Sequence, residues 1–239
     1  MSREMQLAAI RVEGVSFSFG EHRVLDAITT TLDRQEFVCL LGANGTGKMT
    51  LLRIVTGELV PETGSVQIGA PEIIGNSEAE RTPVTYLPQR LPTPEYLSVR
   101  ELVAMSRYRS SNAWGWRPTE EDRSAVDAAM ARCNVDAMAD RPFDQLSGGE
   151  AQRTWLAFCL AQRQAFVLMD EPLHALDFRS RREFFGLLSQ IPREQGTGVA
   201  ITAHEVGLAE EFADRIVVLR EGRAVWDGPP GAENLGKLL

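Results

Sequence analysis

Apolar and polar positions in the first third of the chain follow the patterns of β-strands. Residues 10–17 alternate in part between apolar and polar side chains, and residues 27–32 form a second candidate strand. Residues 36–41 are apolar almost without interruption, which is typical of a strand that is buried on both faces of a sheet. A helical pattern follows and stops at Gly57, a residue suited to the end of a helix.

The middle of the chain changes from strands to helices. Residues 69–82 are polar with Gly and Pro, which predicts a surface loop, and residues 84–87 form a short strand. From about residue 97 to residue 162 the pattern is helical. Three residues whose side chains can cap a helix N-terminus open the expected helices: Ser98 (in a capping box with Glu101), Thr119 and Ser147.

Strand and helix patterns alternate in the last third. Strands are expected over 166–169, 199–202 and 216–219, and helices over 178–188 and 205–212. This alternation predicts a parallel sheet with helices on its faces, and therefore an α/β fold. The helical middle then corresponds to a subdomain inserted between two halves of that sheet.

Composition and charge narrow the class of protein. The 239 residues are 44% hydrophobic and 24% charged, which excludes collagen-like, disordered and disulfide-scaffold chains. The net charge of −8 argues against nucleic acid or an anionic lipid surface as the main partner. No apolar run approaches the length of about 18 residues that a membrane span needs. Residues 1–10 lack the apolar segment of a signal peptide.

Cysteine and lysine usage add two further expectations. The three cysteines, Cys39, Cys133 and Cys159, are an odd number at wide spacings, so we expect reduced thiols rather than a disulfide framework or a zinc site. Of the 25 basic residues only two are lysines, Lys48 and Lys237. A chain that otherwise uses arginine has therefore kept a lysine at position 48.

Lys48 completes the pattern Gly42-x4-Gly47-Lys48 between a buried strand and a helix. This is the context of a P-loop, in which backbone N–H groups close around the phosphates of a nucleotide. The N-terminus of the helix favours the negative charge, and Lys48 supplies a positive one. A glycine turn at the end of a strand is the structural alternative.

Two acidic residues, Asp170 and Glu171, end the apolar strand over 166–169. A carboxylate at the carboxyl end of a strand beside a P-loop can hold Mg²⁺ through water, and the next carboxylate can polarise the attacking water. Acidic residues are common where strands lead into loops, so this pattern gains its meaning from the P-loop.

A second anion-binding pattern lies at Leu146-Ser147-Gly148-Gly149-Glu150. Two glycines after an N-capping serine leave the N–H donors of a helix N-terminus uncovered. One compact domain does not need two phosphate cradles for one nucleotide. The second cradle is therefore expected to serve a nucleotide held by another copy of the chain.

These motifs together resemble those of ABC ATPase subunits along nearly the whole chain. Residues 146–150 resemble the ABC signature, residues 42–48 the Walker A motif, and Asp170-Glu171 the Walker B motif with its catalytic glutamate. Gln89 matches the Q-loop glutamine, Ala175-Leu176-Asp177 the D-loop, and His204 the switch histidine. Phe19 lies where the family places an aromatic ring that stacks on adenine.

The resemblance implies the following residue roles. Glu171, His204 and Gln89 are implied to be catalytic, and Asp170 and Gln89 to hold Mg²⁺, with Asp170 acting through water. Residues implied to bind ATP are Phe19, Gly42, Ala43, Asn44, Gly45, Thr46, Gly47, Lys48, Met49, Thr50, Ser147, Gly148, Gly149, Glu150 and Asp177.

Four of these residues have plainer alternatives. Phe19 can equally be a core aromatic of its strand, since Phe17 alternates close by. Gln89 can be a polar residue that merely follows a strand, and His204 a surface histidine. Asp177 can be the N-cap of the helix that begins at residue 178, and both of its roles can hold together. The arginines of that helix, Arg179, Arg181 and Arg182, are expected to form a solvated face.

Two stretches resemble a narrower group, the ATPases of iron-siderophore, haem and cobalamin importers. They are residues 116–122, Trp-Arg-Pro-Thr-Glu-Glu-Asp, and residues 139–142, Ala-Asp-Arg-Pro. Trp114 and Trp116 are expected to pack within the helical subdomain rather than to contact a permease.

Two positions depart from the family pattern. His174 stands where Ser or Thr usually opens the D-loop. Met49 stands where Ser or Thr follows the P-loop lysine, and that hydroxyl normally ligates Mg²⁺. A thioether is a soft ligand that Mg²⁺ does not favour, and Thr50 is rotated by about 100° along a helix. Weaker metal binding or a slower hydrolysis rate is expected.

The resemblance implies a single ABC ATPase domain over residues 1–239. Residues 1–89 and 163–239 would form the P-loop NTPase core with an antiparallel β part near the N-terminus, and residues 90–162 the helical subdomain. Two copies would enclose two MgATP, acting with a transmembrane permease and a substrate-binding protein at the cytoplasmic face of the membrane, without nucleic acid.

Two other functions compete with this interpretation. A non-transport ABC protein that acts on DNA or ribosomes typically carries tandem cassettes, coiled coils or basic extensions, whereas this chain has one cassette and a net charge of −8. A nucleotide-binding regulatory subunit that has lost hydrolysis is supported by Met49 alone.

Overall fold

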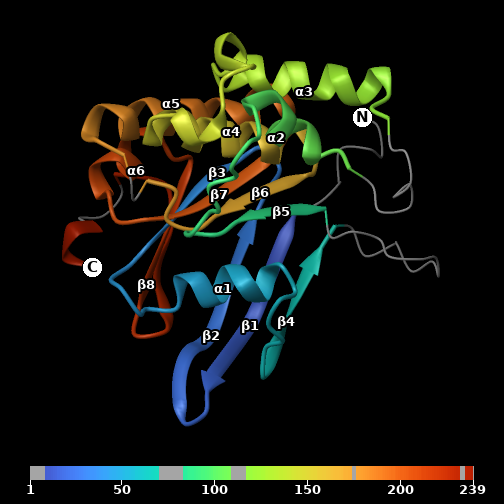
Figure 1. Ribbon diagram of the computed structural model, residues 1–239. Coiled ribbons are helices and arrows are strands. Elements are labelled where there is room, and N and C mark those ends of the chain that lie inside the picture. The colour runs from blue at the N-terminus through green and yellow to red at the C-terminus, as the bar shows by residue number, and fades with distance from the viewer. Residues whose placement is uncertain (1–8, 70–82, 109–116, 174–175, 232–234, 239) are drawn as a thin grey trace, which may run out of the picture.

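The computed structural model describes residues 9–69, 83–108, 117–173, 176–231 and 235–238. In this part of the chain two sheets lie against several helices (Figure 1). Trp114, Trp116, His174 and Ala175, together with residues 70–82 of the loop predicted over 69–82, lie outside the described residues.

The larger sheet has six strands in the order β5-β6-β7-β3-β8-β9. All neighbours pair in parallel except β8 and β9, which are antiparallel. The bounds are β3 Phe37–Leu41, β5 Val84–Leu87, β6 Phe166–Met169, β7 Gly198–Ala203, β8 Arg215–Arg220 and β9 Arg223–Gly228. The prediction of a mainly parallel sheet is confirmed.

The smaller sheet is antiparallel, with the order β2-β1-β4. Its strands are β1 Ile10–Phe19, β2 His22–Leu32 and β4 Thr63–Ile68. β2 begins at His22, earlier than the predicted residue 27. Ala27, with a φ of 52°, is an irregularity inside the strand, and it interrupts the apolar and polar alternation on which the prediction relied. The backbone N–H of Ala27 bonds to Ser16 Oγ across the irregularity.

Helices cover both faces of the larger sheet. Their bounds are α1 Lys48–Val55, α2 Val99–Met105, α3 Glu120–Arg132, α4 Gly148–Ala161, α5 Phe178–Gln195 and α6 Val206–Phe212. Short 3-10 helices span Asp136–Met138, Phe143–Gln145 and Leu235–Lys237. In the described part of the chain, none of the helices combines the length with the hydrophobicity that a bilayer crossing demands.

The central strand β3 separates two hydrophobic cores. Phe37, Cys39 and Leu41 pack into the core formed with α2 to α6. Val38 and Leu40, which point to the other face, pack with α1 and the antiparallel sheet. Figure 1 shows this layering, with α1 below the sheet and α2 to α5 above it. Every residue of β3 is buried, as its unbroken apolar pattern predicts.

The three predicted N-caps all open helices. Ser98, Thr119 and Ser147 each accept a hydrogen bond from the third helical backbone N–H of α2, α3 and α4, respectively. In every case the side chain of that third residue bonds back to the N-cap, which completes a capping box.

Two strands and part of a helix were not predicted. β4 and β9 are edge strands in which no residue is fully buried: β4 is mostly exposed and β9 is mostly half-buried. α5 continues past the predicted Leu188 to Gln195, with Pro192 inside the helix and Gly196, at a φ of 61°, as its C-cap. Ile191 and Pro192 are buried, so packing extends the helix beyond its expected end.

Candidate functional site

The loop over residues 42–47 joins β3 to α1 at the carboxyl end of the parallel strands. Two of its positions need glycine. A Cβ atom on Gly42 would lie 2.5 Å from the Leu219 carbonyl oxygen, and one on Gly47 would lie 2.5 Å from Leu25 Cδ2. Both residues also have positive φ angles, 155° and 99°. The glycines therefore let the backbone curl tightly at the start of α1.

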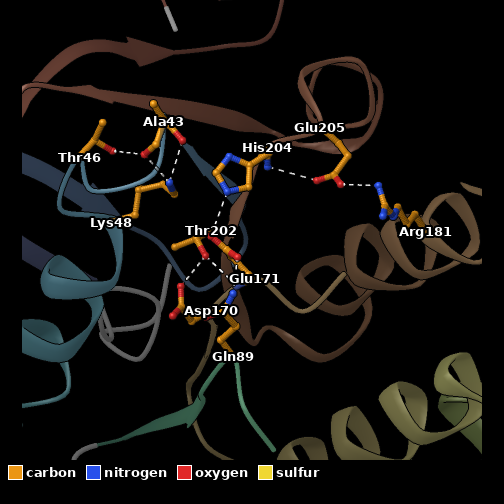
Figure 2. A network of polar contacts seen from close by, with 11 residues as sticks. Ala43, Thr46, Lys48, Gln89, Asp170, Glu171, Arg181, Thr202, His204 and Glu205 are labelled. Atoms are coloured by element: carbon orange, nitrogen blue, oxygen red, sulfur yellow. Dashed lines mark hydrogen bonds and ion pairs between the residues drawn. The ribbon is translucent and has the colours of Figure 1, made fainter. Parts of the chain in front are cut away.

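Lys48 is folded back onto this loop. Its Nζ atom donates to the carbonyl oxygens of Gly42 (2.7 Å) and Ala43 (3.0 Å), as Figure 2 shows in part. Thr46 Oγ1 also donates to the Ala43 oxygen, at 3.0 Å. Burial lowers the pKa of Lys48, against the opposing effect of the Glu171 and Asp170 carboxylates. The ammonium is thus buried, held by two neutral acceptors and close to two acids.

Thr202, at the end of β7, organises the acidic pair that follows β6. Its hydroxyl donates to Asp170 Oδ1 at 2.7 Å and accepts from the backbone N–H of Glu171 at 2.7 Å. Burial raises the pKa of Asp170, with a further rise from the Glu171 charge, while the Thr202 hydrogen bond lowers it. The sequence analysis did not identify Thr202. A threonine inside an otherwise apolar, fully buried strand beside β6 is the signal that could have found it.

Glu171 is held in an unusual backbone conformation, with a φ of 42°. Positive φ values are uncommon for residues other than glycine and cost free energy, so the surrounding contacts must maintain this one. Its Oε2 accepts from Gln89 Nε2 at 2.5 Å, and its Oε1 lies 2.9 Å from His204 Nε2 (Figure 2). The structure thus brings together the three residues that the sequence predicts to be catalytic.

One carboxylate oxygen of the acidic pair is left without a partner in the described part of the chain. Asp170 Oδ2 is buried and has no hydrogen-bond partner among the residues that the structure describes. An unpaired buried carboxylate oxygen is unfavourable unless a water or a cation satisfies it. Oxygen is also the ligand atom that Mg²⁺ prefers. Asp170 and its surroundings therefore fit a magnesium ion held directly or through water.

The position after Lys48 fits a magnesium ion less well. Met49 is 44% exposed at the start of α1 and offers a thioether instead of a hydroxyl. Thr50, the neighbouring hydroxyl, is buried among the residues on the inner side of α1. The thioether of Met49 therefore faces solvent, whereas the hydroxyl of Thr50 is buried.

The second predicted cradle lies at the N-terminus of α4. Ser147 and Gly148 are exposed, and Gly149 is partly buried. Glu150 accepts hydrogen bonds from Ser147 N (2.7 Å) and Oγ (2.9 Å), and its carboxylate also pairs with Arg141 at 3.1 Å. These contacts lower the pKa of Glu150, the backbone hydrogen bond of Ser147 most of all.

The two cradles lie in different layers of the molecule. α1 packs into one core and α4 into the other, on opposite faces of the larger sheet (Figure 1). Within the described part of the chain, no hydrogen bond or ion pair joins residues 147–150 to residues 42–50. The two cradles are therefore built on separate layers of one copy.

For Phe19 and Asp177 the structure tests the structural alternative to the predicted role in ATP binding. Phe19 is 52% exposed and contacts Phe17 edge-on, with ring centroids 4.9 Å apart, so it is not a core residue. Asp177 is exposed and caps α5, since its Oδ1 accepts from Ser180 N at 2.8 Å. The N-cap interpretation of Asp177 is confirmed, and its exposed side chain can also contact a second copy.

The prediction of a solvated arginine face on α5 is right for two residues and wrong for the third. Arg179 pairs with Glu183 and Arg182 with Glu211, and both arginines are more than half exposed. Arg181 is only 33% exposed and reaches Glu205, next to His204. Sequence reasoning missed Arg181 and Glu205 because their contacts depend on how α5 docks beside α6.

Comparisons with known proteins agree on one family. A sequence profile described as ABC transporter matches residues 25–174. The ferric enterobactin transport ATP-binding protein of Escherichia coli is 35% identical over 94% of this chain and 83% of its own length. The hemin import ATP-binding protein of Rhodococcus jostii is 37% identical over 92% of this chain and 75% of its own length. A dimeric bacterial ABC transporter cassette aligns with a TM-score of 0.72 and 25% identity, over 92% of this chain and 98% of that one.

Proposed function

The chain belongs to the ABC transporter family, whose ATPase subunits bind and hydrolyse ATP, and we propose that it powers solute import through a separate transmembrane permease. The observation that carries this proposal is the meeting of Glu171, Gln89 and His204 beside the loop over 42–47. A phosphate cradle and an oriented carboxylate in one place suit transfer of a phosphoryl group to water.

ATP binding would replace the internal contacts of the loop. The backbone N–H groups of residues 42–47 and the N-terminus of α1 would bind the phosphates. Lys48 would exchange the carbonyl oxygens of Gly42 and Ala43 for phosphate oxygens, which are stronger partners for a buried ammonium. Phe19, exposed at the end of β1, would stack on the adenine.

Glu171 would orient and polarise the attacking water. Its positive φ and the Thr202 hydrogen bond to its N–H fix the direction of the side chain before any ligand arrives. Gln89 and His204 each bond to one of its two oxygens, and each carboxylate oxygen can accept a second hydrogen bond, so the attacking water would bind at a remaining lone pair. His204 would then contact the γ-phosphate, and Gln89 would relay the state of the site to the permease.

Mg²⁺, when bound, would neutralise charge on the β- and γ-phosphates. Asp170 would hold it through its unpaired Oδ2, directly or through water, and Gln89 would add an oxygen. Met49 removes the hydroxyl that usually completes this set, so we expect weaker metal affinity and slower hydrolysis than with a serine at this position.

Two copies would complete two sites. Ser147 to Glu150 of one copy would close over the nucleotide bound at Lys48 of the other, with Asp177 acting across the same contact. The separation of the two cradles within one copy supports this arrangement. Closure would drive the permease, and hydrolysis would reopen the pair.

The transported solute is proposed from the relatives that import iron chelates and haem. We assign a ferric siderophore or a related metal chelate, delivered to the permease by a substrate-binding protein. The chain would lie at the cytoplasmic face of the membrane. Residues 90–162 would act as the helical subdomain that meets the permease, and residues 1–89 and 163–239 as the core.

Two measurements test this function. Purified chain should show Mg²⁺-dependent ATP hydrolysis that Lys48→Ala abolishes, and it should co-purify with an integral membrane protein. Deletion of the chain should remove uptake of an isotopically labelled ferric siderophore or haem, and Lys48→Ala should fail to restore it. ATP binding without any hydrolysis would instead favour the regulatory subunit that Met49 suggests.

A further inference from the structure

Arg181 connects the chain segment after Glu171 to the loop that carries His204. Its Nε donates to the carbonyl oxygen of Leu176 at 2.8 Å, and its Nη1 donates to Glu205 Oε1 at 2.9 Å. Glu205 Oε2 in turn accepts from the backbone N–H of His204 at 3.2 Å (Figure 2). One guanidinium thus bonds to both segments.

These contacts form a closed ring. On one side, His204 Nε2 touches Glu171 Oε1 directly at 2.9 Å. On the other side, the backbone N–H of Leu176 donates to the carbonyl oxygen of Leu173 at 3.1 Å, which ties Leu176 to the chain just after Glu171. Arg181 and Glu205 continue this connection from Leu176 to His204. The relative position of the two reacting side chains therefore depends on two links, of which only one lies at the reaction centre.

The geometry of Arg181 suits a positioning role. Its side chain is 33% exposed and that of Glu205 is 24% exposed, so the pair is partly shielded from solvent. The planar guanidinium presents different nitrogens to Leu176 and Glu205, which holds both partners at a fixed angle. Its neighbour Arg182 also joins α5 to α6, through Glu211, but that pair is more exposed, and among the described residues no hydrogen bond joins Arg182 to Leu176 or Glu205.

We propose that Arg181 is a positioning residue for ATP hydrolysis, which fixes the His204 loop relative to the Glu171 segment. The proposal rests on the proposed ATPase function. Arg181 lies four residues after Asp177, which would meet the second copy. A displacement of the residues around Asp177 would reach His204 through Arg181 and Glu205, so the arrival of the second copy would align the site.

The test compares Arg181→Met with Arg182→Met as the matched control. Neither arginine touches the phosphate cradle, so ATP affinity should stay within about twofold of wild type in both variants. Arg181→Met should lower kcat about tenfold, because misplacing a catalytic group by a fraction of an ångström is costly. Arg182→Met should leave kcat unchanged. A kcat for Arg181→Met within twofold of wild type, or equal losses in the two variants, would overturn the proposal.

A second measurement does not need turnover. Backbone amide exchange in the peptides that cover Glu171 and His204 should become about tenfold faster in Arg181→Met, in both peptides together, and in neither for Arg182→Met. Absence of hydrolysis in wild type would contradict the proposed function alone, and this exchange comparison would then decide on Arg181. Equal exchange in the two variants would contradict the positioning role.

Discussion

Glu171 illustrates how much a single residue depends on its neighbours. Its φ of 42° is maintained by the Thr202 hydroxyl, and Gln89 and His204 hold its two carboxylate oxygens. Such a conformation is unfavourable in isolation and persists because several contacts agree on it. These contacts offset the free-energy cost of the conformation, and the result is a carboxylate whose orientation is fixed in the absence of a ligand.

The exposed ring of Phe19 predicts a loss of affinity that is specific to the base. Phe19→Ala should weaken ATP binding by about 1 kcal/mol, the value of one aromatic contact, and should leave pyrophosphate binding unchanged. Titration calorimetry with both ligands makes the comparison. Equal losses for the two ligands would remove the adenine role of Phe19.

Met49 predicts a change in metal dependence. In Met49→Ser the Mg²⁺ concentration for half-maximal hydrolysis should fall about tenfold, which corresponds to about 1.4 kcal/mol for one regained oxygen ligand. Mn²⁺ should assist wild type more than it assists the variant. Lys48→Ala serves as the blank, and superimposable Mg²⁺ curves would show that the hydroxyl is not needed here.

At the residue scale, short motifs were predictable and tertiary contacts were not. The sequence indicated Lys48, Asp170 and Glu171 because each lies in a local pattern of strand, loop and helix. Thr202 and Arg181 escaped because their roles arise from neighbours that are distant in sequence. A threonine on β7 gains meaning only when β6 lies beside it.

Among the helices, Arg107 joins three elements through one buried side chain. It follows α2, pairs with Asp122 in α3 at 2.9 Å, and donates to the carbonyl oxygen of Ala161 at the end of α4. Both side chains of the pair are about nine-tenths buried. Removing one partner would leave the other as a buried, uncompensated charge.

Arg107→Met should therefore lower the free energy of unfolding by about 3 kcal/mol. Arg100→Met, which breaks an exposed pair between α2 and α3, is the matched control and should cost less than about 1 kcal/mol. Urea unfolding followed by circular dichroism gives both values. A loss for Arg107→Met no larger than for Arg100→Met would contradict the structural role of the buried pair.

Asp122 also predicts how stability changes in acid. Hydrogen bonds from Thr119 and Arg107 lower its pKa to about 2, from an ordinary value of 3.8. Since the unfolded chain takes up this proton first, the stabilisation is complete above about pH 4 and is lost as the pH falls toward 2. The stability difference between wild type and Asp122→Asn should shrink over that interval. A difference independent of pH would contradict the assigned shift.

Elements with strong local signals were predicted with good boundaries. Three capping residues fixed the starts of α2, α3 and α4, and the unbroken apolar run fixed β3. β4 and β9 were missed because edge strands bury little and show a weak pattern. α5 was predicted to end at Leu188, whereas packing of the buried Ile191 and Pro192 extends the helix to Gln195, although proline is unfavourable in a helix interior.

At the scale of the whole molecule, the two predicted phosphate cradles lie on opposite faces of the larger sheet. α1 and the loop before it belong to one layer, and α4 with Ser147 belongs to the other. The alternation of strands and helices predicted helices on both faces of a parallel sheet. No local pattern predicted that the cradles at Lys48 and Ser147 would lie on opposite faces. The central claim of our account is that a second copy brings Ser147 to the nucleotide held at Lys48.

The most direct test measures the oligomeric state of Glu171→Gln by size-exclusion chromatography with light scattering, with and without ATP. This variant should bind ATP without hydrolysing it, so a dimer should accumulate with ATP and dissociate without it. Adding Ser147→Asp keeps a good N-cap but brings a negative charge against the phosphates, so that double variant should stay monomeric. A monomer of Glu171→Gln at every ATP and protein concentration, or a dimer indifferent to Ser147→Asp, would contradict the account.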